Sequence, residues 1–457
     1  MAKNIDFKPS NRSLIKPIMP ESKSQLAPNK PYAVLDVGST KTAVAILNMD
    51  EMDENSQLVY GYATNKTKGI TKGKVTNLDH LSNTISETLK KALNSSEVTK
   101  EIPGILSISG SHVKGVNEIE SLTLNNSHGV ITFEDINKNN TNKYGYKNNP
   151  HSSRRIINEH HISYILDGEH AVINPIGMHS QDIKIKKHVI SGDISEIEKL
   201  ELAAKKAHIL VEGLVHGGTA SSLATQNTSS KNDNLITIDI GGGTTDISIY
   251  ESNCLVYSSV LPLGGFNFSN DISIAFGIDY TQAESIKIKY GLTDIYKSSV
   301  LETLKINLDD DNIIEVPVLD VCQIMKERAQ ELAALIHMEI ESSGITKLKN
   351  CNLTGGSSQI EGIDKIFTKT LQLKTNLCHP NEKEYLKSEY LSPEYSTLFG
   401  MITQIIESKP KLLNIHSNNF EKLTQMSKLP IINKTSTRLK KLIKKPYLKS
   451  VRGEITK

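Results

Sequence analysis

Residues 235–250 constrain the fold of this 457-residue chain more than any other stretch. Apolar and polar side chains alternate before and after a run of three glycines, and this period of two around a glycine turn predicts a β-hairpin. Because glycine carries no Cβ atom, the backbone N–H groups at the tip can approach an anionic ligand closely. The residues predicted to contact such a ligand are Gly241, Gly242, Gly243, Thr244 and Thr245.

Two aspartates, Asp239 and Asp246, flank this tip. Their carboxylates suit a hydrated magnesium ion, which proteins usually hold with one or two carboxylates plus the phosphates of a substrate. An ordinary glycine-rich hairpin with two solvated aspartates is the alternative that this stretch alone leaves open.

Residues 33–47 repeat the same pattern of an apolar strand, an aspartate, a glycine, small hydroxyl residues and a second apolar strand. Asp36 aligns with Asp239, and Gly38 aligns with Gly241. Two hairpins with an aspartate at the same point predict two similar halves of the molecule. These halves are expected to face one phosphate-bearing ligand from opposite sides.

Composition sets limits on the class of protein. The chain is too long for one core, and 37% hydrophobic with 23% charged residues is typical of a soluble globular protein with two or more domains. A net charge of +2 gives no general case for nucleic acid as a partner. The four cysteines form no CxxC pair, and neither a signal peptide nor an apolar run of ~20 residues is found. We therefore expect a cytoplasmic protein.

Residues 111–190 differ in composition and pattern from the segments around them, because they contain Asn-rich loops and short segments in which apolar and polar residues alternate. This stretch is interpreted as an inserted subdomain without catalytic chemistry. Its histidines are too loosely spaced for a zinc site and are expected to be solvated. They are His151, His160, His161, His170, His179 and His188.

A third glycine site lies in residues 350–363, where a strand runs into a double glycine and then into the start of a helix. Gly355 and Gly356 leave room for a flat ring or a ribose against the backbone. Glu284 and Lys287 lie three residues apart on a helix predicted over residues 280–291, and a surface ion pair is the simpler interpretation of that spacing.

The three glycine sites in this order resemble the two phosphate loops and the adenosine loop of the actin/Hsp70/sugar-kinase ATPase fold. Within that superfamily the chain is most similar to the FtsA family of bacterial cell-division proteins, over about residues 30–408 and in the tail as well. Five further motifs support this resemblance: Asn117-Glu118-Ile119, Asn174-Pro175-Ile176-Gly177, Ala275-Phe276-Gly277, Ala283-Glu284-Ser285-Ile286-Lys287 and Pro393-Glu394-Tyr395-Ser396-Thr397.

The resemblance implies an α/β, actin-like (ribonuclease H-like) two-lobed ATPase fold with an FtsA-type inserted subdomain. A disordered N-terminal tail, residues 1–30, and a C-terminal amphipathic helix are expected at the two ends. The implied domains are a first lobe (31–110 and 191–231, completed by a helix at 394–408), the inserted subdomain (111–190), a second-lobe core (232–265 and 326–393), a smaller second-lobe subdomain (266–325), a linker (409–436) and the basic helix (437–452).

The resemblance also implies ATP and magnesium as ligands. The first phosphate loop is then Gly38, Ser39, Thr40 and Lys41, and the second is 241–245. Asp36 and Asp239, with Asp246 nearby, are expected to hold magnesium through water. The residues expected around the adenosine are Glu284, Lys287, Gly355, Gly356 and Ser357.

One departure from the superfamily bears on hydrolysis. Hydrolysing relatives place an acidic residue just before the small-residue helix that follows the last strand of the first lobe. The matching segment here, residues 216–221, contains neither a carboxylate nor a side-chain amide. Because phosphoryl transfer depends on positioning the attacking water, we expect at most a slow ATPase, with ATP acting mainly as a conformational and polymerisation switch.

The C-terminal segment 437–452 is basic and amphipathic. A helix of this kind lies in the headgroup plane of a membrane, and each Lys or Arg near an anionic leaflet adds about 1 kcal/mol. Pro446 limits the helix to about two turns, and a solvated basic tail that touches RNA is the alternative. The residues expected at the membrane are Leu439, Leu442, Ile443, Arg438, Lys440, Lys441, Lys444 and Lys445.

The resemblance therefore implies an adaptor that tethers the tubulin-like protein FtsZ to the cytoplasmic face of the bacterial inner membrane at the division site. Its implied partners are FtsZ, further copies of itself in a protofilament, anionic lipids, and other division proteins through the inserted subdomain. A sugar kinase needs a catalytic aspartate for which no candidate is found, and an Hsp70-like chaperone needs a further β-rich domain. A pilus-assembly protein of the same fold is the remaining alternative.

Overall fold

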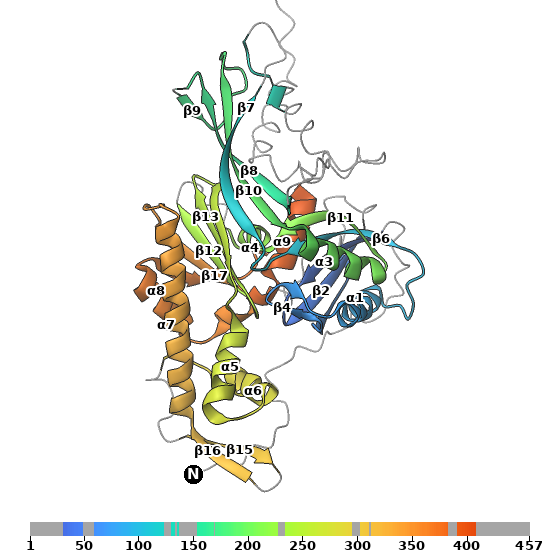
Figure 1. The fold of residues 1–457 in the computed structure, drawn as a ribbon, viewed down its shortest axis with the longest axis vertical. Helices are drawn as coiled ribbons and strands as arrows, with labels where there is room; N and C mark the ends of the chain where they lie inside the picture. The colour runs from blue at the N-terminus through green and yellow to red at the C-terminus, as the bar shows by residue number, and fades with distance from the viewer. Residues whose placement is uncertain are drawn as a thin grey trace, which may run out of the picture.

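The computed structural model contains two lobes and a third sheet that projects from them (Figure 1). The sequence-based interpretations of residues 1–30, 409–436 and 437–452 concern segments outside the part of the chain that the structure describes. The described residues are 31–48, 59–122, 129–132, 135–136, 153–168, 170–226, 234–294, 302–309, 312–382 and 391–407.

The first lobe is a five-stranded sheet with helices on both faces. Side chains alternate along its strands between two cores: Leu35 faces α1 and α3, and its neighbour Val34 faces α4 and α9. Its strands, in spatial order, are β11 (Ile209–His216), β6 (Ile102–Ile108), β1 (Pro31–Val37), β2 (Lys41–Asn48) and β3 (Val59–Lys66). The helices are α1 (Leu78–Leu93) and α3 (Ile194–Lys206) on one face, and α4 (Gly217–Thr225) and α9 (Ser396–Glu407) on the other.

The second lobe repeats this topology. Its hairpin β12–β13 is antiparallel like β1–β2, and two parallel strands follow on the same side of the hairpin, as β6 and β11 do in the first lobe. The prediction of two similar halves is confirmed. The strand order is β14 (Cys254–Leu261), β13 (Thr245–Glu251), β12 (Leu235–Ile240), β17 (Asn350–Thr354) and β18 (Lys374–Leu377).

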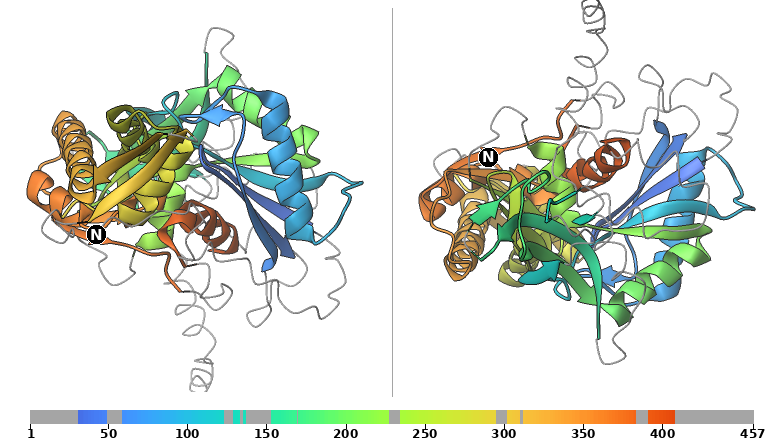
Figure 2. Two further views of the ribbon diagram at one scale, coloured as in Figure 1. Left: turned by 90° about the horizontal axis from the view of Figure 1, so that it is seen from below. Right: turned by 90° about the horizontal axis from the view of Figure 1, so that it is seen from above.

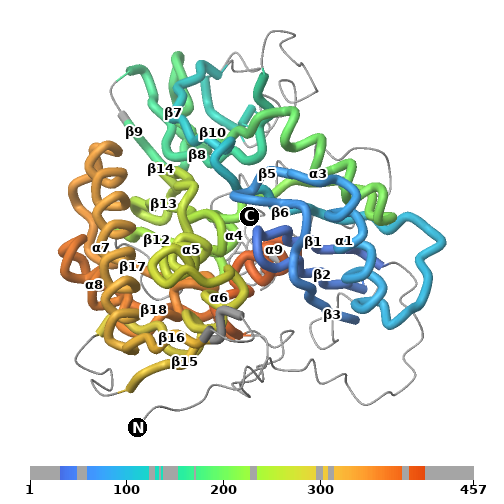
Figure 3. The backbone as a smooth tube through the Cα atoms, turned by 60° about the horizontal axis from the view of Figure 1, so that its bottom comes forward, coloured from blue at the N-terminus to red at the C-terminus, as the bar shows by residue number. Residues whose placement is uncertain are grey.

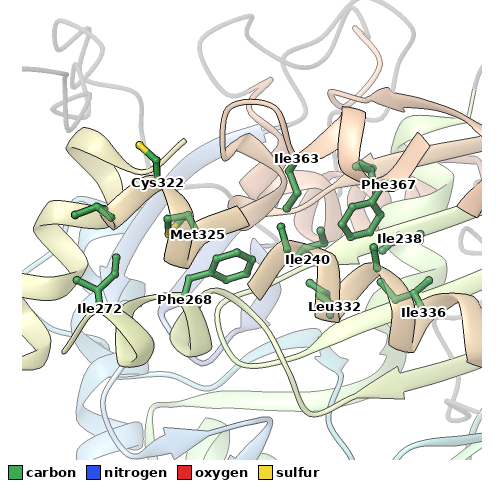
Figure 4. Packing of buried hydrophobic residues seen from close by; sticks show 14 of the residues in the cluster. Ile238, Ile240, Phe268, Ile272, Cys322, Met325, Leu332, Ile336, Ile363 and Phe367 are labelled. Atoms are coloured by element: carbon green, nitrogen blue, oxygen red, sulfur yellow. The ribbon is translucent and has the colours of Figure 1, made fainter. Parts of the chain in front are cut away.

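Two helices, one long and one short, cover the core of the second lobe. Figure 4 shows Phe268 and Phe367 packed with Ile240 and Leu332, all of them buried. The covering helices are α7 (Val318–Ser342) and α8 (Ile363–Leu371), while α5 (Gly265–Phe276), α6 (Tyr280–Tyr290), β15 (Thr303–Asp309) and β16 (Asn312–Pro317) form the smaller end of this lobe. None of the helices in the described residues is long and apolar enough to cross a bilayer.

The inserted segment forms a separate antiparallel sheet at the top of the molecule (Figure 1). Its order is β7 (Lys114–Leu122), β10 (Ile183–Asp193), β8 (Arg154–Leu166) and β9 (His170–Val172). Although both of its connections lead to the first lobe, its base contacts β14 of the second lobe. Asn117 Nδ2 donates a hydrogen bond to the Val256 carbonyl at 3.0 Å, and His188 Nε2 lies 2.8 Å from Ser258 Oγ.

The prediction that the histidines of this segment are solvated is correct for His179 but wrong for His161 and His188, which are buried. His161 Nδ1 lies 3.0 Å from the Tyr164 hydroxyl, and His188 lies in the contact with β14. Within the described ranges, no group of three or more His, Cys, Asp or Glu side chains is placed to hold a metal ion.

Helices α4 and α9 approach so closely that a glycine is required at Gly400. A Cβ atom there would lie 2.9 Å from Ala220 Cα and less than 3.0 Å from the Ala220 carbonyl oxygen. Gly→Ala normally stabilises a helix by about 1 kcal/mol, but forced separation of packed backbones costs about 1–3 kcal/mol or more. We therefore expect Gly400→Ala to lower the free energy of unfolding by about 2 kcal/mol in denaturant titration. Gln404→Ala on the same helix is the control, and equal stability of the two variants would contradict this packing.

His188 gives the fold a defined acid sensitivity. Asn117 Oδ1 accepts a hydrogen bond from His188 Nδ1 at 2.7 Å, which leaves Nε2 of the neutral ring to accept one from Ser258. Burial, followed by the nearby His216, lowers the pKa of His188 from 6.5 to about 4. Between these values the unfolded chain binds a proton that the folded chain does not, so stability falls as the pH falls.

From pH 7 to pH 5 we expect His188 to account for a loss of about 2 kcal/mol in the free energy of unfolding. Replacement of the ring, His188→Gln, is expected to flatten the pH dependence of urea unfolding over this range, whatever its effect on stability at pH 7. The exposed His179→Gln is the control. A wild-type pH dependence in His188→Gln would exclude this assignment.

Candidate functional site

The two glycine turns meet tip to tip between the lobes. A Cβ atom on Gly243 would lie 2.5 Å from Ser39 Oγ, and one on Gly242 would lie less than 3.0 Å from Thr40 Cγ2. Each turn is closed in the same way, because the first glycine N–H donates to a carbonyl three residues later at 2.9 Å. Figure 3 shows the hairpins β1–β2 and β12–β13 on the two sides of α4 and α9, and Figure 2 shows the same two sheets along the long axis. The two predicted phosphate loops are thus adjacent.

Three carboxylates lie behind these turns, at the ends of the hairpin strands. Each accepts a hydrogen bond from a hydroxyl on another element: Asp36 Oδ1 from Ser107 at 2.7 Å, Asp239 Oδ2 from Thr397 at 3.2 Å, and Asp246 from Ser109 at 2.6 and 2.9 Å. Two of these hydrogen bonds cross between the lobes, since Ser109 follows β6 and Thr397 is in the first turn of α9, both in the first lobe.

The carboxylates crowd one another. Burial, followed by the charges of Asp246 and Asp36, raises the pKa of Asp239 to about 7, although hydrogen bonds from Ser221 and Thr397 oppose the shift. Burial is also the largest cause that raises the pKa of Asp36, with Asp246 adding to it. Such a cluster of buried negative charges is stabilised by a cation.

Lys41 is already partnered in the first loop. Its Nζ donates to the Glu394 carbonyl at 2.6 Å, lies 3.3 Å from Glu394 Oε2, and lies 3.5 Å from the centroid of the Tyr395 ring. Burial lowers the pKa of Lys41, and Glu394 is the main opposing charge. Glu394 was not predicted as a site residue, although the motif Pro393–Tyr395, here the 3₁₀ turn η4, is part of the family resemblance.

The third glycine site contacts the second loop directly. Gly355 has φ +89°, and a Cβ atom there would lie 2.6 Å from the Ile240 carbonyl and even closer to Asp239 Oδ1. Ser357, in the 3₁₀ turn η2 (Gly356–Gln359), donates to the Gly241 carbonyl at 3.0 Å. The strand–glycine–helix pattern therefore places Gly355 at the point where only glycine is tolerated.

Glu284 and Lys287 form an ion pair of 2.7 Å, and the alternative of a simple surface pair does not describe it well. Lys287 Nζ also donates to the Gly265 carbonyl at 3.2 Å, and the side chains of Lys287 and Glu284 are only 11% and 29% exposed, respectively. Glu284 accepts further hydrogen bonds from Ser269 and from Tyr280, the latter at 3.2 Å.

Gly265 connects this pair with the rest of the site. Its N–H donates to the Gly241 carbonyl at 2.9 Å, and a Cβ atom on Gly265 would lie 3.4 Å from Lys287 Nζ. The structure therefore brings the predicted phosphate and adenosine residues into one contiguous site. The turn at Gly264–Gly265 was not predicted as part of that site.

His216 occupies the segment in which the sequence shows no acidic residue. It is fully buried at the N-terminus of α4, where its Nδ1 accepts a hydrogen bond from the Thr219 N–H at 3.3 Å. The proton of the neutral ring is therefore on Nε2, which lies 3.4 Å from Asp246 Oδ1. An imidazole thus faces the carboxylate cluster from the first lobe.

The turn between β4 (Ile70–Thr71) and β5 (Lys74–Val75) is a further part of the site that the sequence analysis did not predict. The Gly73 N–H donates to Ser39 Oγ at 3.3 Å. Its two strands are too short for a periodic signal. The predicted membrane residues, by contrast, lie in 437–452 and outside the described part of the chain.

Comparisons with solved structures agree with this architecture. The PilM-PilN type IV pilus biogenesis complex has a TM-score of 0.56 at 14% identity, over 82% of this chain and 98% of that chain. MreB5 of Spiroplasma citri bound to ADP has a TM-score of 0.50 at 13% identity, over 85% of this chain and 99% of that one. These similarities confirm the actin-like two-lobed α/β fold.

Comparisons of sequence identify the family. The family model for cell division protein FtsA matches residues 236–400, and the model for the SHS2 domain inserted in FtsA matches residues 110–191. Cell division protein FtsA of Buchnera aphidicola subsp. Acyrthosiphon pisum is 29% identical over 388 residues, which cover 80% of this chain and 89% of the relative. The FtsA of Pseudomonas aeruginosa is 23% identical over 409 residues, covering 88% and 95%. The two models together match more than half of the chain, and the chain belongs to the FtsA family of cell division proteins.

Proposed function

We propose that this FtsA-family protein binds ATP between its lobes, assembles into actin-like protofilaments, tethers the FtsZ ring to the membrane and recruits later division proteins. The observation that carries the ATP site is the meeting of two glycine turns, one from each lobe, in front of three carboxylates, of which Asp239 and Asp246 are buried and Asp36 is half-buried. Further support comes from MreB 5 of Spiroplasma citri, a protein of similar fold whose structures are bound to ADP and to AMPPNP.

The phosphates of ATP would lie on the N–H and hydroxyl groups of residues 38–41 and 241–245. The absence of side chains at the second tip, residues 241–243, fits a phosphate ligand. The three carboxylates are not placed to hold a metal ion by themselves, and they suit a magnesium ion that the phosphates and water also hold. Asp36, Asp239 and Asp246 would hold the magnesium through water, and the ion would supply positive charge to offset the phosphates. Lys41 would reach the phosphates by leaving the Glu394 carboxylate.

The adenosine would lie beside Gly355, Gly356 and Ser357, with Glu284 and Lys287 toward the ribose and base. These groups already form a connected surface through Gly265 and Gly241. ATP would act mainly as a switch, because the segment that begins at His216 lacks the acidic residue that hydrolysing relatives have at this point of the chain. The protein is thus proposed to be at most a slow ATPase.

The proposed contacts with the membrane and with other proteins are based on the amino-acid sequence. The basic segment 437–452, tethered by the linker 409–436, would bind anionic lipid at the cytoplasmic face of the inner membrane. The inserted subdomain, residues 111–190, would contact other division proteins, and the remaining domain limits are proposed as predicted. The fold similarity to PilM-PilN favours a pilus-type assembly protein as second candidate, but such a protein would lack the basic helix.

The ATP site predicts a specific effect at Gly355. Wild-type protein is expected to bind one ATP in the presence of magnesium by isothermal titration calorimetry. Gly355→Ala is expected to weaken binding at least tenfold, because its Cβ atom would displace Asp239 Oδ1 and strain a residue at φ +89°. Gly177→Ala is the matched control, since Gly177 has φ +86° with nothing within 4 Å of a Cβ atom. Equal ATP affinity in both variants would rule out this placement of the adenosine loop.

If segment 437–452 binds the membrane, its removal should prevent the protein from sedimenting with lipid vesicles. Full-length protein is expected to sediment with vesicles of anionic phosphatidylglycerol and much less with vesicles of neutral phosphatidylcholine, because the segment is basic. Truncation after Ser408 removes the helix and is expected to abolish binding. Leu442→Glu places a charge on the apolar face of the full-length chain and is expected to reduce binding strongly. Unchanged sedimentation of the truncated chain would refute the tether.

A further inference from the structure

The β4–β5 turn lies where the two proposed phosphate loops meet. Its residue Gly73 donates to Ser39 Oγ of the first loop at 3.3 Å. Its residue Lys72 faces the second loop, since its backbone nitrogen would lie 3.1 Å from a Cβ atom on Gly243. A hairpin separate from both loops therefore contributes to their junction.

This turn is held firmly against the first lobe. Gly73 has φ +75°, and a Cβ atom there would lie 2.5 Å from Gly110 Cα and closer still to the Ser109 carbonyl. Ser109 in turn donates to Asp246. The position of the turn is therefore fixed by the same residues that hold the carboxylate cluster.

Lysine is an unfavourable residue for this turn. Lys72 has φ +50° and is followed by Gly73 at positive φ, which is the pattern of a type I′ turn with a preference for Asn, Asp or Gly at its first position. A non-glycine residue in the left-handed region costs roughly 1–2 kcal/mol. Because another residue would form the turn more easily, the lysine side chain itself needs a reason.

The charges around the loops supply that reason. Lys41 is paired with Glu394 and Lys287 with Glu284, whereas the half-buried Lys72 has no hydrogen bond or ion pair to any residue of the described part. A polyphosphate that enters beside three carboxylates needs a cation. Of these three lysines, Lys72 is the one that no carboxylate already occupies.

The contacts of the second loop also indicate which of its ends faces the adenosine and which faces the terminal phosphate. Its first glycine, Gly241, contacts the adenosine side through Gly265 and Ser357. Its last glycine, Gly243, faces Lys72 and Ser39. Lys72 therefore lies at the end of the loop away from the adenosine, where the terminal phosphate of a nucleotide would be.

We propose that the Lys72 ammonium binds the terminal phosphate and gives the site its preference for a nucleoside triphosphate over a diphosphate. This assignment rests on the proposed ATP site. The side chain is long enough to extend from the turn toward the phosphate, and as a compact point charge it suits a phosphate oxygen.

The test compares ATP and ADP, each with magnesium, on the full-length protein by calorimetry. Lys72→Ala is expected to lower ATP affinity at least tenfold while ADP affinity changes less than twofold. Alanine has the same Cβ atom at φ +50°, so the strain of the turn is retained, and unchanged ADP affinity also shows that the site is folded. Lys72→Arg is expected to restore most of the ATP affinity. Lys74→Ala, an exposed lysine of the same hairpin, is expected to bind both nucleotides like the wild type.

The outcomes separate the two proposals. If the wild type binds both nucleotides and Lys72→Ala keeps the same ratio of ATP to ADP affinity, the role of Lys72 is overturned and the ATP site stands. If Lys74→Ala lowers the ratio as much as Lys72→Ala, general charge and not Lys72 sets the preference, and the assignment also fails. If the wild type binds neither nucleotide, the ATP site fails together with the assignment.

Discussion

The contact between the two glycine turns is the constraint on which the rest of the site depends. Gly242 lies against Thr40, and Gly243 lies against Ser39, with no space for a Cβ atom at either position. A side chain on either glycine would have to move the loops, and hence the lobes, apart. The hairpins that carry these turns have the same place in two sheets of the same strand order, so the fold itself brings their tips together.

The carboxylates add a second constraint, because they hold the lobes together while repelling one another. Ser109 of the first lobe donates to Asp246 of the second, and Thr397 at the start of α9 donates to Asp239. A pKa of about 7 for Asp239 shows how strongly burial and neighbouring charge oppose its ionisation. The hydrogen bonds between the lobes are therefore made to carboxylates, Asp246 and Asp239, whose negative charge the surrounding protein atoms alone balance poorly.

Much of the fold and part of the site could be predicted from local patterns. The alternation of apolar and polar residues around Gly241, and the same pattern around Gly38, each predict a hairpin formed within sixteen residues. Both hairpins are confirmed. The actin-like fold and the family are confirmed as well. The roles assigned to the individual site residues, and the domain limits, remain predictions.

The features that sequence reasoning missed depend on contacts between distant segments. Lys41 and Glu394 are 353 residues apart, and no local pattern connects them. His188 was predicted to be solvated because the histidines of its segment are too loosely spaced for a zinc site, but its burial is decided by β14, which lies 70 residues further along. Lys72 lies in a hairpin of two-residue strands, which are too short for any period to be seen. Its significance comes only from the position of the turn, where Gly73 contacts Ser39 of the first loop and Lys72 faces Gly243 of the second.

The inserted sheet links the two lobes, although the chain enters and leaves it from the first lobe. On the first-lobe side, Arg154 donates to the His112 carbonyl at 2.8 Å, and Arg155 forms an ion pair with Glu201 of α3. On the second-lobe side, Asn117 and His188 bind Val256 and Ser258 of β14. Leaving a buried polar group unpaired costs about 1–3 kcal/mol, so a rotation of one lobe against the other must carry the inserted sheet with it or break these hydrogen bonds at that cost. The arrangement of the sheet is therefore coupled to the arrangement of the lobes, and through the lobes to the glycine turns that meet between them.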